Sequence, residues 1–162
     1  MSNNDGSLDY FDKARALAAT GLILAALVAI GGSLLDWVHI TPPEIVPASE
    51  APNIEPFSGV EAQDGLWVIS GALILIVCGV GLVVRRRSGY AVLAFLVSVV
   101  IGAIAIADYR GISEVSSAIS QRMNIVGQAT AGIGLKLVAA AALVGVISSV
   151  IGLAATPRSV GQ

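Results

Sequence analysis

The sequence predicts an all-α, polytopic membrane protein: a four-helix transmembrane bundle with a short amphipathic helix outside the membrane. Hydrophobic residues make up 56% of the 162 residues and charged residues only 12%, about half the charged share of ordinary soluble domains. The apolar residues also fall into four long blocks instead of alternating with polar ones. An uncharged block of about 18 residues or more is long enough to cross a bilayer as a helix.

Four blocks without any charged residue are the predicted spans, and polar segments separate them. The first block, 16–35, also resembles the apolar region of a signal peptide, but it is full length and continues into LLDWVHI without a small-residue cleavage site, which favours a membrane anchor. The predicted organisation is a cytoplasmic segment 1–15, a transmembrane domain 16–155 with spans at about 16–35, 66–84, 90–107 and 137–155, outer loops 36–65 and 108–136, and a tail 156–162.

The basic residues predict how the chain is oriented in the membrane. Four crossings place both termini and the RRRSG turn on one side, which carries six of the nine basic residues. Basic residues near span ends are retained in the cytoplasm, so we expect a multi-pass plasma-membrane protein with cytoplasmic N and C termini. Arg85, Arg86 and Arg87 are interpreted as this orientation signal, with lipid headgroups as additional contacts.

Four aromatic residues lie at predicted span ends, where amphipathic rings prefer the headgroup zone. These membrane-interface anchors are Trp37, Trp67, Tyr90 and Tyr109. Outside the membrane, Ile112, Val115, Ile119 and Met123 recur at steps of three and four, which predicts a short amphipathic helix on the outer leaflet. The first outer loop contains five prolines and six acidic residues without any basic one, so we expect an extended, partly ordered segment.

Small residues repeat at four-residue spacing along three spans. Such ladders let helix backbones approach closely inside a membrane, within the protein's own bundle or against a partner helix. The candidate partner-helix packing residues are Gly21, Ala25, Ala29 and Ser33 in the first span, Ala94, Ser98 and Gly102 in the third, and Ala141, Gly145 and Ser149 in the fourth.

The chemistry of the sequence excludes several functional classes. The predicted spans contain no Asp, Glu, Lys, Arg or His, the groups that pumps, ion-coupled transporters and intramembrane proteases place inside the membrane. A net charge of −2 argues against a nucleic-acid partner. One cysteine, Cys78, allows neither an intrachain disulfide nor a thiolate metal cluster. We therefore expect no catalytic residue, no resident metal and no cofactor.

A few short motifs suggest a family. LLDW closes the first span, GLW opens the second, and an Arg-rich turn precedes an Ala/Val/Gly-rich third span. With these features the chain resembles small four-span membrane proteins of actinobacteria, and loosely the tryptophan-associated transmembrane protein group. The resemblance implies the four-span architecture but little about activity.

The expected function is that of a non-catalytic accessory or stabilising subunit of a larger plasma-membrane complex, such as a respiratory complex or an envelope lipid transporter. Its partners would be other integral membrane subunits, the lipid bilayer and an extracytoplasmic protein at loop 36–65. One alternative is a homo-oligomeric transporter or channel for an apolar or lipid substrate, with a pathway lined by Ser33, Ser70, Ser98, Ser148 and Ser149. The other is an outer-face metal-dependent enzyme or sensor that uses Asp36 and His39, with Glu44 or Asp64 as a third ligand.

Overall fold

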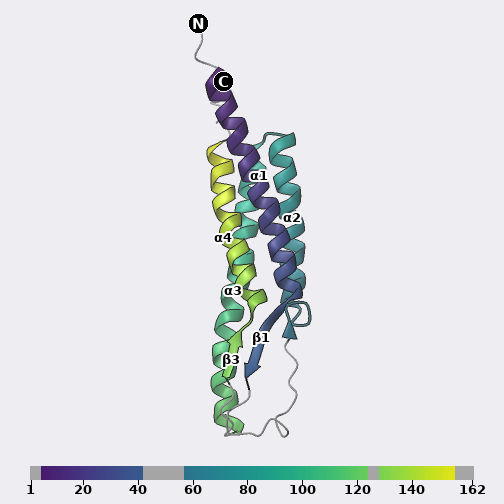
Figure 1. Cartoon of the computed structure of the whole chain (residues 1–162), viewed down its shortest axis with the longest axis vertical. Helices are drawn as coiled ribbons and strands as arrows, with labels where there is room; N and C mark the ends of the chain where they lie inside the picture. Colours follow the sequence, from purple (N-terminus) through teal and green to yellow (C-terminus); the bar gives the residue numbers. More distant parts are fainter. Residues whose placement is uncertain (1–4, 42–56, 124–127, 156–162) are drawn as a thin grey trace.

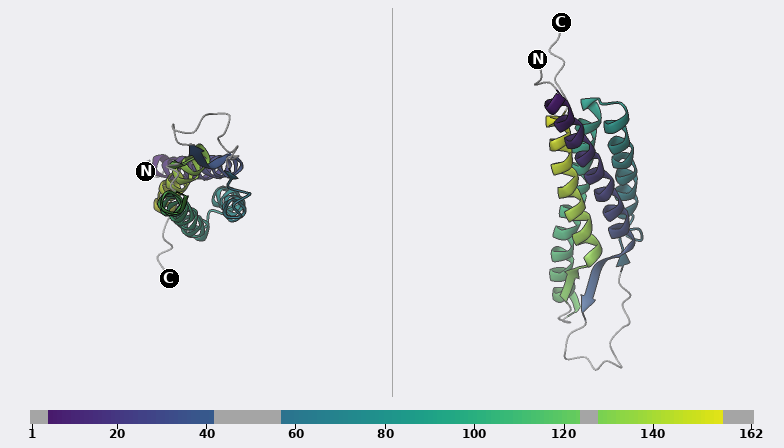
Figure 2. Two further views of the ribbon diagram at one scale, coloured as in Figure 1. Left: turned by 90° about the horizontal axis from the view of Figure 1, so that it is seen from below. Right: turned by 45° about the horizontal axis from the view of Figure 1, so that its top comes forward.

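Four long helices form an up-and-down bundle in which each helix contacts the next along the chain and the last returns to the first (Figures 1 and 2). The computed structural model describes residues 5–41, 57–123 and 128–155. The helices are α1 (Asp5–Leu34), α2 (Asp64–Val84), α3 (Ser88–Met123) and α4 (Ile133–Ala154). The all-α fold class predicted from the uncharged blocks is confirmed.

Each helix is long and apolar enough to cross a membrane. The candidate spans are Tyr10–Leu34, Asp64–Val84, Ser88–Ile112 and Ile133–Ala154, of which 21 residues is the shortest. At a rise of about 1.5 Å per residue, 21 residues extend about 31 Å, which matches the hydrocarbon thickness of a bilayer. Large aliphatic side chains on all four helices face outward, as expected for a surface solvated by lipid. The chain is therefore a multi-pass membrane protein.

The interior of the bundle combines a few large aliphatic side chains with many small ones. Leu22, Leu75, Leu82, Ile101 and Leu135 are among the largest fully buried residues. Alanines and serines occupy most of the remaining buried positions on α1, α3 and α4. Because small side chains allow close backbone approach, the helices pack through van der Waals contact over much of their length.

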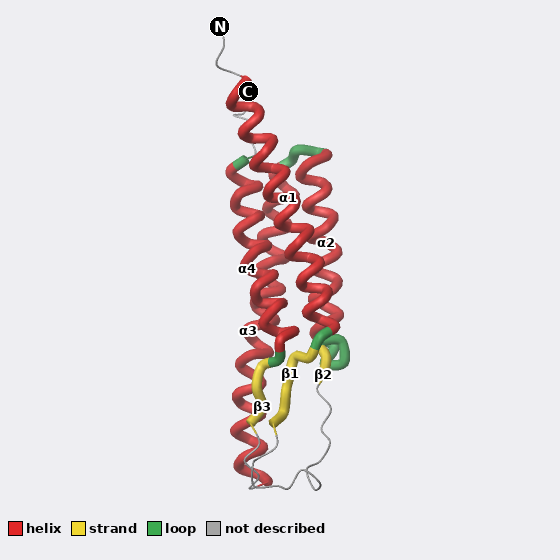
Figure 3. The backbone as a smooth tube through the Cα atoms, in the orientation of Figure 1, coloured by secondary structure: helices red, strands yellow, loops and turns green. Residues whose placement is uncertain are grey.

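A small antiparallel sheet covers one end of the bundle (Figure 3). Its central strand β1 (Asp36–Thr41) follows α1 directly and pairs with β2 (Phe57–Ser58) on one side and β3 (Gln128–Ala131) on the other. The β1–β3 register runs from Val38 opposite Ala131 to Thr41 opposite Gln128. The sheet thus joins the two segments that the sequence analysis treats as separate outer loops. The five prolines of the first loop begin just after β1 and lie outside the described residues.

The short amphipathic helix is not present as a separate element. Residues 112–123 continue α3, a single helix of 36 residues whose C-terminal part lies alongside the sheet (Figure 1). No proline interrupts this stretch, and Gly111 alone costs only about 1 kcal/mol relative to alanine in a helix. With nothing to break the helix, the third span and the predicted outer helix are one element.

The start of α1, the end of α4 and the α2–α3 turn share the end of the bundle opposite the sheet (Figure 1). We refer to these as the turn end and the sheet end. Because the chain has four spans, an even number, α1 begins and α4 ends on the same side of the bundle.

Candidate functional site

The predicted small-residue ladders lie in the seams of the bundle itself. Eight of the ten residues are buried and the other two, Gly21 and Gly102, are partly buried. A Cβ at Gly21 would run into the Ser148 hydroxyl of α4, and one at Gly145 would run into the Ser98 hydroxyl of α3. The ladders therefore close the α1–α4 and α3–α4 seams, and they leave little of themselves on the lipid-facing surface.

The four predicted interface aromatics fall into two groups. Trp67 and Tyr109 are exposed and Tyr90 is partly buried against Gly81. Trp37, in contrast, is only 2% exposed and belongs to the protein core. Its indole Nε1 donates a hydrogen bond to the Gly32 carbonyl at 2.9 Å, and its ring fits against glycines 59 and 134. Trp37 is thus a core residue where α1, the sheet and α4 meet, and not a headgroup anchor.

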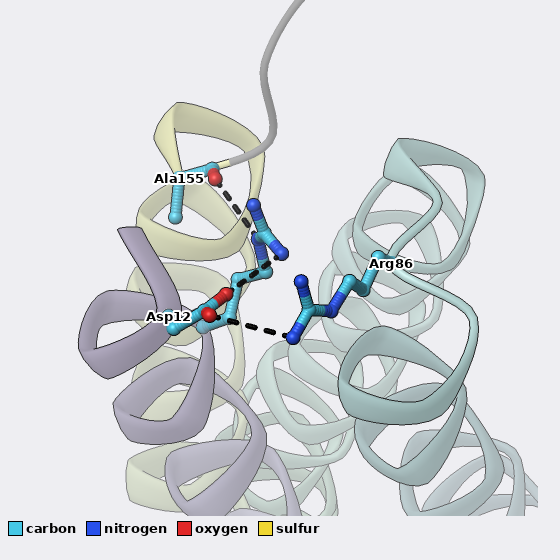
Figure 4. A network of polar contacts seen from close by, with 4 residues as sticks. Asp12, Arg86 and Ala155 are labelled. Atoms are coloured by element: carbon cyan, nitrogen blue, oxygen red, sulfur yellow. Dashed lines mark hydrogen bonds and ion pairs between the residues drawn. The ribbon is translucent and has the colours of Figure 1, made fainter. Parts of the chain in front are cut away.

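A polar network ties three segments together at the turn end (Figure 4). Buried Arg15 donates from Nε to the Ala155 carbonyl at the end of α4 and from Nη1 to Asp12 Oδ1, both at 3.1 Å. The other Asp12 oxygen pairs with Arg86 in the α2–α3 turn at 3.3 Å. Arg86 adopts a left-handed backbone with φ of 51°. The last carbonyls of a helix have no intrahelical partner, and Arg15 supplies a hydrogen-bond donor to one of them.

Arg86 therefore contributes more than an orientation signal. Arg85 and Arg87 are exposed beside it, where contact with headgroups remains a prediction. The role of Arg15 in binding the end of α4 could not be read from the sequence, because 140 positions separate the two residues.

The α2–α3 seam contains an apolar groove of about 450 Å³. Its walls are long or β-branched side chains, and its only small lining residues are Ser70 and Gly71 of α2. Nine residues line it: Trp67, Ser70, Gly71, Ile74, Leu96, Val97, Val100, Ile101 and Ile104. The volume falls within the range of about 300–1,000 Å³ that is typical of small-molecule sites.

Two carboxylates lie at the sheet-end limit of the same seam. Asp64 precedes the groove residue Trp67 by three positions on α2, and Asp108 follows Ile104 by four on α3, about one helical turn in each case. Burial acts most strongly on the Asp108 carboxyl, and Asp64 acts on it both through its charge and through a side-chain hydrogen bond. The Oδ2 atom of Asp108 is buried without a hydrogen-bond partner among the described residues. In the sequence Asp108 lies at the start of a predicted polar loop, so this pair was not predicted.

Just outside the span of α2, Glu61 closes the turn that follows β2. Its Oε2 accepts hydrogen bonds from the Ser58 backbone N–H at 2.8 Å and from the Ser58 hydroxyl at 3.0 Å. These hydrogen bonds favour the charged form and lower the pKa of Glu61 below its ordinary value.

The residues of the two alternative hypotheses are not brought together. Asp36 and His39 are exposed on β1, Asp64 lies beside Asp108, and Glu44 is outside the described residues. Within the described part of the chain, no three His, Cys, Asp or Glu side chains cluster so as to hold a metal ion. Of the five serines proposed to line a pathway, Ser33, Ser98, Ser148 and Ser149 are buried, and Ser70 alone lines the groove.

Comparison with known proteins finds no relative: no protein-family model, curated protein or solved structure matches the chain. The class of protein rests on the fold alone. The chain is a four-span membrane protein with a small sheet at one end of its bundle.

Proposed function

We propose that the protein is a non-catalytic accessory or stabilising subunit of a larger plasma-membrane complex. The observation that carries this proposal is the combination of helix and sheet at the sheet end. There α3 continues through the polar stretch 113–123, which contains Glu114 and Arg122, beside a three-stranded sheet. A bundle that supports a shaped extramembrane surface suits recognition of another protein.

The surfaces proposed for docking are those that the bundle does not use for its own helix packing. Because the small-residue ladders close the protein's own seams, the partner contact is assigned to the sheet end and to the acidic segment that follows β1. That segment contains Glu44, Glu50 and Glu55 and no basic residue. Its charge would complement a basic surface on an extracytoplasmic partner. Cytoplasmic termini, which the arginine distribution predicts, would place this surface outside the cell.

The test is purification of the tagged protein from its native membrane in mild detergent, with mass spectrometry of the proteins that accompany it. We expect a defined set of subunits in fixed stoichiometry. Replacing Glu44, Glu50 and Glu55 by glutamine should lower the recovery of those subunits in low salt. Glu61→Gln is the matched control, because Glu61 is already engaged by Ser58. Recovery of the protein alone, or only as a homo-oligomer, would contradict the accessory role.

A homo-oligomeric transporter of an apolar or lipid substrate is the second candidate, and the α2–α3 groove favours it. It predicts self-association in membranes and substrate movement by the purified protein in vesicles. Resemblance to the tryptophan-associated group also stays a hypothesis and adds no activity to either candidate.

A further inference from the structure

The Asp64–Asp108 pair lies in the same seam as the groove between α2 and α3, about one helical turn beyond the residues that line it. The groove lies within the candidate spans, so it opens to the bilayer. From Trp67 to Ile74 it runs about 10 Å along α2 at helical rise. At its sheet-end limit, one turn farther along each helix, are the two carboxylates. A ligand that contacts both the groove and the two carboxylates therefore needs an apolar part and a polar, cationic end.

The width of the groove decides between an acyl chain and a helix. Its floor is closed, because a Cβ at Gly71 would already lie 3.2 Å from Ile101 Cδ1. Packed helix axes are about 8–10 Å apart, whereas a helix with its side chains is about 10–12 Å across. A third helix thus spans the rims without entering the groove. An acyl chain is narrow enough to enter, and the surrounding lipid supplies it.

The charge at the mouth of the groove selects the headgroup. Asp64 and Asp108 are hydrogen-bonded through their side chains, and a cation beside them offsets the negative charge that they carry when ionised. Asp108 Oδ2 also has an unused acceptor site that is shielded from solvent. A primary ammonium group supplies both the positive charge and N–H donors.

We propose that the α2–α3 groove and the Asp64–Asp108 pair bind a membrane lipid whose headgroup carries a primary ammonium. The acyl chain lies along Gly71 and Ile101, and the ammonium sits beside the two carboxylates, in the leaflet on the sheet side. This site is independent of the proposed docking role, because its ligand comes from the bilayer and not from a partner protein.

Trp67 provides the measurement, because it lines the groove and is 70% exposed. The protein is reconstituted into nanodiscs of phosphatidylglycerol that contain a small fraction of lipid with brominated acyl chains, which quench tryptophan fluorescence. Brominated phosphatidylethanolamine is compared with brominated phosphatidylglycerol at the same fraction. Trp37, the only other tryptophan, is buried, and a Trp67→Phe variant measures its background signal.

We expect the phosphatidylethanolamine to quench Trp67 with several-fold higher apparent affinity than the phosphatidylglycerol. Asp108→Asn together with Asp64→Asn should remove this preference. Ser70→Phe should lower the apparent affinity for the phosphatidylethanolamine, because the larger ring occupies the groove. Leu73→Phe is the matched control, since Leu73 is exposed on the same helix but does not line the groove.

Equal quenching by the two lipids in the native protein would overturn the proposal. So would a preference that survives the double asparagine variant, or one that Ser70→Phe leaves unchanged. Folding of every variant is checked by the reactivity of Cys78, which is buried in the native bundle. Should the double variant expose Cys78, the comparison of Ser70→Phe with Leu73→Phe still decides the outcome, because both substituted residues are exposed.

Discussion

The α1–α4 and α2–α3 seams are built from the same kinds of apolar helix but are packed in different ways. At the first seam Gly21 faces Ser148, and Gly32 and Gly134 meet backbone to backbone. At the second, Gly71 and Gly81 bring α2 close to α3. Val97, Val100 and Ile104 line a groove in the same seam. The size of the residues at a few positions therefore determines whether two membrane helices close against each other or leave a groove between them.

The largest expected effect follows from removing the core residue at the sheet end of the closed seam. Trp37→Ala should lower the free energy of unfolding by about 3–5 kcal/mol, because a large buried side chain leaves a cavity. The measurement is alkylation of Cys78, the single and buried cysteine, as a function of temperature in mild detergent. Trp67→Ala, in the open seam, is the control and should change the labelling midpoint little. Similar midpoints for both variants would contradict the assignment of Trp37 to the core.

Overfilling the closed α3–α4 seam is the next largest change. Gly145→Leu places a side chain where Ser98 already lies, and overpacking of this kind costs about 1–3 kcal/mol. We expect Cys78 to become reactive at a lower temperature than in the native protein. Two controls bracket the result. Gly71→Ala in the open seam should be nearly neutral, because Ile101 can move into the groove. Gly31→Ala places its new methyl group where no atom lies within 4 Å, so it should stabilise α1 by up to about 1 kcal/mol.

The turn end gives a smaller contrast, between a buried and an exposed arginine. Arg15→Met removes the hydrogen bond to the Ala155 carbonyl and leaves Asp12 with Arg86 alone. Loss of a buried hydrogen-bonding partner costs about 1–3 kcal/mol. Arg86→Met breaks only the exposed ion pair and should cost about 1 kcal/mol or less. Thermal unfolding by circular dichroism would separate the two, and a larger effect at Arg86 than at Arg15 would contradict the structure.

The smallest effect is the pH dependence of the Glu61 turn. The folded state lowers the pKa of Glu61 through hydrogen bonds from Ser58, so unfolding binds protons as pH falls. The stabilisation is fully present above the ordinary carboxyl pKa of about 4.3 and is lost as pH falls through the lowered value. Thermal midpoints compared between pH 6 and the acidic range should therefore fall less in Glu61→Gln than in the native protein. An identical pH dependence in both would show that this turn does not contribute.

Three features show what could and could not be predicted from the sequence. The four helices were predictable because uncharged blocks of membrane length have one stable state in lipid. The burial of Trp37 was not predictable, because a tryptophan at a span end can lie either in the headgroup zone or in a core pocket. Its close packing against Gly59 and Gly134 shows that it lies in a core pocket. The Asp64–Asp108 pair was also hidden, because 44 positions separate residues that only the α2–α3 packing brings together.

By itself, the sequence determined the number of spans, their helical state and the even number of crossings, since each depends on local hydrophobicity and on backbone hydrogen bonding within a single segment. Only the tertiary structure decided which glycines close a seam, and that β1 pairs with β3 although α2 and α3 separate them in the chain. It also decided that an apolar groove and two carboxylates share the α2–α3 seam. These features depend on contacts between segments distant in the chain. The shapes of packed side chains determine such contacts, and no local pattern in the sequence encodes them.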